Sequence, residues 1–132
     1  MNIKQLNEVL TTFIDNRPYA DFDVAGLYET IIPKDFGSIS FDEIDKVKDY
    51  LKLDEVKTED ELRGIRNTIV KYCYEHTNKI DRDKEIAEYQ AKNPNGSFKD
   101  FRKQSKYERM WDQMSAFTHV IDMELHKRFG HL

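Results

Sequence analysis

The chain has 132 residues, of which 39% are hydrophobic and 35% charged, and its formal net charge is −4 at pH 7. This length predicts one domain with a real core, and five Gly and three Pro argue against an all-β or disordered chain. No apolar run approaches the roughly 20 residues of a membrane span, and none resembles a secretion signal. The single Cys cannot form a disulfide within the chain, so we expect a cytoplasmic protein.

The charge is unevenly distributed. Residues 1–60 carry 7 Lys or Arg and 14 Asp or Glu, whereas residues 61–132 carry 14 and 11. No long linker separates the two parts, which favours a single domain over residues 1–132. We expect acidic N-terminal helices within 1–57 to pack on a helical hairpin formed by 58–132.

The N-terminal part predicts a helix over about residues 2–16, ended by Pro18, because the residue before a proline avoids the helical region. Asp23 is placed to cap a second, short helix that ends before Pro33. The alternative for residues 22–41 is a small β-hairpin pairing 29–32 with 38–41, since β-branched residues are frequent there. We favour the helix.

Two capping boxes open the next helices. Ser40, followed three residues later by Glu, predicts a helix to about Leu53, and Thr58 predicts another. The second helix keeps an apolar face as far as residue 91, although it could break near Thr77–Asn78. The turn Asn93–Gly96 then predicts an antiparallel partner, so two long helices, about 58–92 and 97–129, form the hairpin.

The C-terminal stretch carries the strongest helical pattern of the chain. Its apolar residues recur every three or four positions, at Tyr107, Met110, Trp111, Met114, Phe117, Ile121, Leu125 and Phe129. Capping boxes at Ser97 and Ser105 indicate a short first helix and a longer second one, and Gly130 is a natural stop. The sequence therefore predicts an all-α bundle of about five helices. A bundle seam and a dimer seam look alike, so a monomer and a homodimer both remain open.

A row of polar side chains borders this stripe and raises the question of a metal site. His119, Asp122 and His126 lie three and four residues apart, which brings neighbouring side chains together on a helix. Two imidazoles and a carboxylate can bind a divalent ion. The two histidines, however, are two turns apart, so we favour a solvated face with an Asp–His ion pair. Cys73 and His76 similarly suggest a nucleophile and base, but core packing is the simpler interpretation.

Basic and aromatic residues alternate in the segment 92–109, which has a net charge of +4. Basic groups neutralise phosphates and aromatic rings stack on unpaired bases, so this segment is a candidate for nucleic-acid or acidic-protein contact. The candidate contact residues are Phe98, Lys99, Phe101, Arg102, Lys103, Lys106 and Arg109. An exposed helix start whose Phe residues pack inward would give the same pattern.

Asp42, Asp45 and Asp49 lie on one face of their predicted helix and form a candidate acidic surface. Carboxylate rows can imitate nucleic-acid phosphates, although lysines at helical spacing favour an ordinary ion-paired surface. No Gly-rich phosphate loop or catalytic motif appears, and no cofactor is expected. The leading hypothesis is a non-enzymatic module that acts by protein–protein contact, such as a regulator or inhibitor of a nucleic-acid-handling partner. Nucleic-acid binding through 92–109 and a metal-dependent enzyme are the alternatives.

Overall fold

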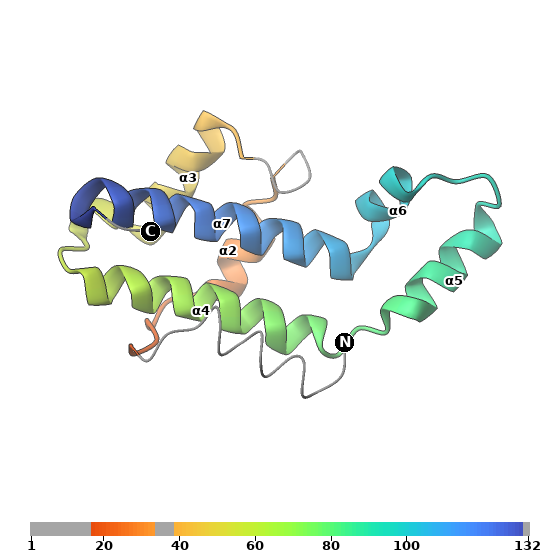
Figure 1. Ribbon diagram of the computed structural model, residues 1–132, viewed down its shortest axis with the longest axis horizontal. Coiled ribbons are helices and arrows are strands. Elements are labelled where there is room, and N and C mark those ends of the chain that lie inside the picture. Colours follow the sequence, from red (N-terminus) through yellow and green to blue (C-terminus); the bar gives the residue numbers. More distant parts are fainter. Residues whose placement is uncertain (1–16, 34–38, 131–132) are drawn as a thin grey trace.

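The structure is a computed structural model that describes residues 17–33 and 39–130, so the helix expected over residues 2–16 lies outside the described residues. All regular secondary structure in the described part is helical, as the sequence predicts. It comprises six α-helices and one 3₁₀ turn, whereas the sequence predicts about five helices for the whole chain (Figure 1). These elements are α2 Val24–Thr30, α3 Phe41–Leu51, η1 Leu53–Glu55, α4 Glu59–Thr77, α5 Arg82–Lys92, α6 Phe98–Gln104 and α7 Lys106–Phe129.

The predicted helix starts are confirmed. Side-chain oxygens of the expected caps accept hydrogen bonds from backbone amides that have no partner within the helix, at Asp23, Ser40, Thr58, Ser97 and Ser105. Ser40 and Glu43 form a reciprocal capping box, with bonds of 3.0 and 3.2 Å. At its other end, α7 stops at Gly130, whose positive φ of 74° suits a residue without a side chain.

The centre of the molecule is the antiparallel pair of α4 and α7 (Figure 1). The predicted stripe of α7 supplies its side of the core, where Phe117, Ile121 and Leu125 are fully buried. α4 supplies Leu62, Ile69, Val70 and Cys73. The apolar stripe predicted on α7 thus packs against α4 of the same chain.

α2 packs across this pair. Its Tyr28 is buried, meets Phe117 edge-on at 5.1 Å between ring centroids, and donates a hydrogen bond of 2.9 Å to the carbonyl of Ile69. Gln113 donates from Nε2 to the carbonyl of Tyr28 at 2.7 Å. Buried polar groups on α2 and α7 thereby satisfy each other.

The β-hairpin alternative for residues 22–41 is wrong over the described residues, because Glu29 and Thr30 belong to α2 and no strand is present there. The cap at Asp23 and the burial of Leu27 and Tyr28 against the core favour a helix over the β-branched character of this segment. Ser38, the start of the second expected strand, lies outside the described residues.

A continuous helix over residues 58–92 is also wrong, and the alternative break near Thr77–Asn78 is found. α4 ends at Thr77, whose hydroxyl bonds back to the carbonyl of Cys73 at 2.7 Å. A new helix then begins because the carboxylate of Asp81 accepts the backbone N–H of Lys84 at 3.0 Å. α5 consequently points away from α7 instead of running along it (Figure 1).

The smaller helices are attached at opposite ends of α7 (Figure 1). α3 lies near its C-terminal end, where Lys48 pairs with Glu124 at 3.1 Å. η1 is held there too, since Arg128 donates to the carbonyl of Leu53 at 2.8 Å. α6 leads directly into the N-terminal end of α7. None of the described helices combines the length and apolarity needed to cross a membrane.

Candidate functional site

The most distinctive surface belongs to the segment formed by α5, α6 and the start of α7, residues 82–106, which we call the arm. It projects beyond one end of the α4–α7 pair (Figure 1). α5 buries none of its 11 residues, and Phe101 is the one buried residue of α6. The arm carries seven Lys or Arg against four Asp or Glu, a net charge of +3 in a protein of net charge −4.

Polar contacts hold the arm against the start of α7. The carboxylate of Glu85 accepts a hydrogen bond from the hydroxyl of Ser105 at 2.7 Å and another from the backbone N–H of Lys106 at 2.9 Å. A carboxylate is favourable at this position because a helix N-terminus carries partial positive charge. Arg82 of α5 also pairs with Glu108 of α7 at 2.7 Å. Sequence reasoning identified Ser105 as a cap but missed Glu85, whose role depends on the position of α5.

The two candidate arginines of this region, Arg102 and Arg109, bind groups of the same chain. Arg102 forms an ion pair with Asp112, a residue only 7% exposed. Burial raises the pKa of the Asp112 carboxyl, while the charge of Arg102 acts in the opposite direction. Arg109 donates to the carbonyl of Pro33 at 2.7 Å. These guanidinium groups therefore contribute to the fold and offer little to a partner.

The lysines of the arm behave differently from the arginines. The side chains of all five are exposed, and their ammonium groups pair with no acid among the residues that the structure describes. We call the four that lie in the segment 92–109 the arm lysines: Lys92, Lys99, Lys103 and Lys106. Phe98 beside them is 59% exposed, with its ring 5.9 Å from that of Phe101. The arm thus presents positive charge around one exposed aromatic ring.

Phe101 turns inward and is only 4% exposed, where its ring meets Tyr89 at 5.5 Å. Of the seven candidate contact residues, the structure therefore places four on the open surface and three in internal contacts. The exposed four are Phe98, Lys99, Lys103 and Lys106.

The candidate acidic surface lies on α3, at the other end of the molecule. Its three acids are exposed and pair with no described lysine or arginine; they are Asp42, Asp45 and Asp49. Phe41, one helical turn before Asp45, is 87% exposed. The opposite side of α3 buries Ile44, Val47 and Leu51, so the acidic side and Phe41 face solvent.

The three residues of the metal hypothesis are not brought together as ligands. Asp122 pairs with Arg66 of α4 at 2.9 Å, whereas His119 and His126 are exposed. The expected Asp–His pair is replaced by an Asp–Arg pair, which the sequence could not indicate because the partners are 56 residues apart. No three His, Cys, Asp or Glu side chains of the described ranges form a group suited to a metal ion.

Cys73 and His76 do not form a nucleophile–base pair. Cys73 is fully buried, and burial raises the pKa of its thiol to about 12. The ring of His76 stacks on Tyr72 at 3.8 Å, and its Nδ1 lies 2.9 Å from the carbonyl oxygen of Tyr72. Cys73 thus serves core packing, as expected, whereas His76 is only half-buried and stacks on Tyr72.

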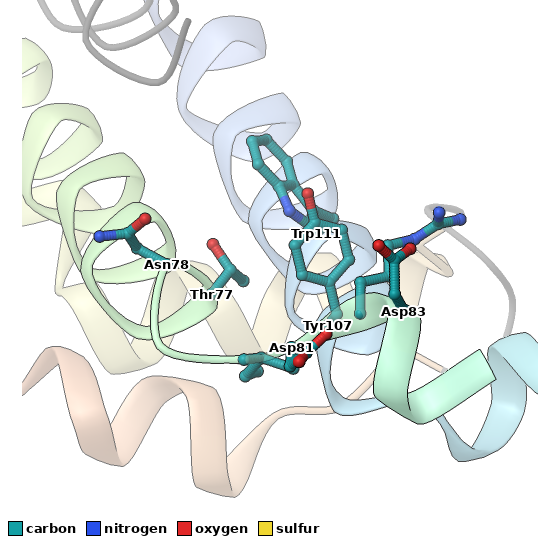
Figure 2. A pocket seen from close by; sticks show the side chains of 8 residues that line it. Thr77, Asn78, Asp81, Asp83, Tyr107 and Trp111 are labelled. Carbon is teal, nitrogen blue, oxygen red and sulfur yellow. The ribbon is translucent and has the colours of Figure 1, made fainter. Parts of the chain in front are cut away.

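A pocket of about 280 Å³ opens where α4 connects to α5 (Figure 2). Thr77, Asp81, Tyr107 and Trp111 are among the side chains that line it. The indole Nε1 of Trp111 is buried and makes no hydrogen bond with a described residue. This donor suits a water molecule or another small acceptor, while the volume lies just below the roughly 300–1,000 Å³ of typical ligand pockets.

No family model matches this chain, and neither a curated protein nor a solved structure is detectably similar to it. The exposed surfaces and their chemistry are therefore the basis for a functional proposal.

Proposed function

We propose that the chain is a small cytosolic binding module that docks its arm on an acidic surface of another protein, and that it regulates or inhibits that partner by occupying the surface. One observation carries this proposal: the arm lysines are exposed and unpaired by any described acid, although the neighbouring arginines are all engaged with internal groups. The fully buried, reduced Cys73 suits the cytosol.

The arm has two features that support protein contact. Unpaired lysines attract an acidic partner over several ångströms and speed its approach. Phe98 then supplies an apolar anchor that loses water on contact, and aromatic side chains are typical of binding hot spots. Because α5 buries no residue and α6 buries only Phe101, the exposed side chains of these helices can bind without disturbing the α4–α7 pair.

A protein partner is favoured over nucleic acid by the aromatic residues. Stacking on single-stranded bases needs exposed rings, yet Phe101 is buried and the ring of Tyr107 is covered by the Arg82 guanidinium at 5.7 Å. Phe98 alone remains exposed among the three aromatics that suggested base stacking.

The proposal is tested by affinity capture from cells of the source organism, lysed at physiological salt. We expect the tagged chain to retain an acidic protein in stoichiometric amount. The variant Lys99→Glu/Lys103→Glu should lose it, because both replacements place negative charge on the contact surface. Raising the salt concentration should release it, since exposed charge pairs are screened within about 8 Å at physiological ionic strength.

The matched control is Lys52→Glu/Lys79→Glu, which changes the net charge equally at exposed positions outside the arm. This variant should retain the partner. The proposal fails if no stoichiometric protein is captured, or if both variants lose it equally. Nuclease-sensitive capture of DNA or RNA by the wild type would favour the nucleic-acid alternative instead.

A further inference from the structure

The two charged surfaces of the molecule are fixed far apart. The arm is tied to α7 by the Arg102–Asp112 pair, and α3 is tied to it by the Lys48–Glu124 pair. Asp112 and Glu124 are twelve residues apart in one helix, which is about 18 Å along its axis at about 1.5 Å per residue. This separation exceeds the screening length of about 8 Å in physiological salt. The surfaces cannot neutralise each other within one chain.

The two surfaces nevertheless match in chemistry. On α3, Asp45 and Asp49 follow Phe41 at successive helical turns, and all three are exposed. On α6, Lys99 and Lys103 are likewise one turn apart and exposed beside Phe98. Each surface therefore offers charges with no described partner around one exposed aromatic ring. Acids outnumber the exposed Lys46 on the α3 surface, and lysines outnumber the exposed Asp100 on the α6 surface, so the net signs are opposite.

We propose that a second copy of this chain is a partner of the arm, with the α3 surface of one copy docked on the α6 surface of another. The inference rests on the proposed function, because it uses the same arm surface. Docking pairs carboxylates with ammonium groups that face solvent in the single chain, and it brings Phe41 and Phe98 out of water together.

The contact between copies is weak and salt-dependent. Exposed ion pairs are individually weak because water and salt screen them, and few such pairs are available here. We therefore expect dissociation constants between about 10 μM and 1 mM. An association in this range is suited to concentration-dependent competition between a second copy and another acidic partner for the same arm.

Sedimentation velocity of the full chain at increasing concentration and two salt levels tests the proposal. The wild type should associate at low salt and dissociate at high salt. Lys99→Glu/Lys103→Glu should weaken association by about tenfold or more, since opposite charges become like charges. Asp45→Lys/Asp49→Lys should do the same; Asp42 is left in place because it stabilises the first turn of α3.

Recombining the two variants gives the decisive result. Each variant alone should remain monomeric, whereas an equimolar mixture, or all four replacements in one chain, should associate again because the charges regain complementarity. A wild type that stays monomeric at about 1 mM protein and low salt overturns the proposal. Failure of the mixture to associate also overturns it. Neither outcome affects the proposed function, which predicts capture of a different protein by the same lysines.

Discussion

Glu124 illustrates how single residues fasten α3 to the core. Its side chain is nearly buried, pairs with Lys48 at 3.1 Å and accepts from Arg128 at 2.9 Å. Burial alone would raise the pKa of this carboxyl, but the hydrogen bond and charge of Lys48, together with Arg128 and Lys127, outweigh it and hold the pKa below the ordinary 4.5. The charged form therefore stabilises the folded chain.

Replacement of Glu124 by Gln should lower the free energy of unfolding at pH 7 by about 1–3 kcal/mol, because Lys48 and Arg128 lose a charged acceptor. A lowered folded-state pKa gives stability that is complete above pH 4.5 and is lost as the pH falls through the folded value. The difference between wild type and variant should hence shrink in acid. Urea unfolding at pH 7 and pH 3 measures it.

The control for this prediction is Glu75→Gln. Glu75 pairs with Lys71 at 3.8 Å but is 57% exposed, so its loss should change stability by less than about 0.5 kcal/mol. Equal effects of the two substitutions would contradict the role given to Glu124.

At the scale of elements, α7 combines two functions in one sequence pattern. Its apolar stripe fills the core opposite α4. At its N-terminal end, Ser105 bonds to Glu85 and Glu108 pairs with Arg82, which attaches the arm. α6 and α7 are separate helices because each has its own capping serine, and Ser105 both caps α7 and ends α6. The arm can thus point in its own direction without interrupting the stripe.

Two Phe→Ala substitutions should differ in their effect on the free energy of unfolding, because one ring lies in the core and the other on the surface. Phe117 is fully buried, so Phe117→Ala should lower the free energy of unfolding by about 3–5 kcal/mol through lost burial and a cavity. Phe98 is 59% exposed, so Phe98→Ala should change it by about 0.5 kcal/mol or less. Chemical denaturation of both variants tests the pair. A large loss for Phe98→Ala would mean that its side chain packs inside.

Ser105→Ala should loosen the attachment of the arm. Ser105 is 2% exposed, accepts the N–H of Glu108 at 3.1 Å and donates to Glu85, so its loss should cost about 1–2 kcal/mol. Hydrogen exchange should rise in α5 and in the first turn of α7 but not in the middle of α4. Ser97→Ala removes only the cap of α6 and should leave exchange in α5 unchanged. The assignment is wrong if Ser105→Ala has no effect on α5.

At the scale of the whole molecule, the sequence predicts elements better than it predicts their arrangement. Helix starts at Ser40 and Ser105 follow from local capping chemistry, which acts within four residues and can be read directly. The sequence leaves the break after Thr77 undecided, since Ile80 and later apolar residues keep the helical period of α4. Only the contacts of the folded chain show that α5 turns outward.

For the candidate contact surface, charge and aromatic spacing indicate the segment 92–109, which stays a prediction. The cap at Ser105, where this segment meets the core, is confirmed. The sequence could not separate Lys99 and Lys103 from Arg102, because the last is distinguished by its buried partner Asp112. Distant pairs of this kind depend on how helices pack, which local patterns do not specify.

Site-specific photo-crosslinking tests whether the arm touches another polypeptide, as we propose. A photoreactive phenylalanine analogue is placed at Phe98 in the full chain, and at Glu75, an exposed position on α4, as control. After irradiation in cells of the source organism, we expect protein adducts from position 98 that disappear with Lys99→Glu/Lys103→Glu, and few adducts from position 75. Equal adducts at both positions, or adducts with nucleic acid alone, would contradict the claim.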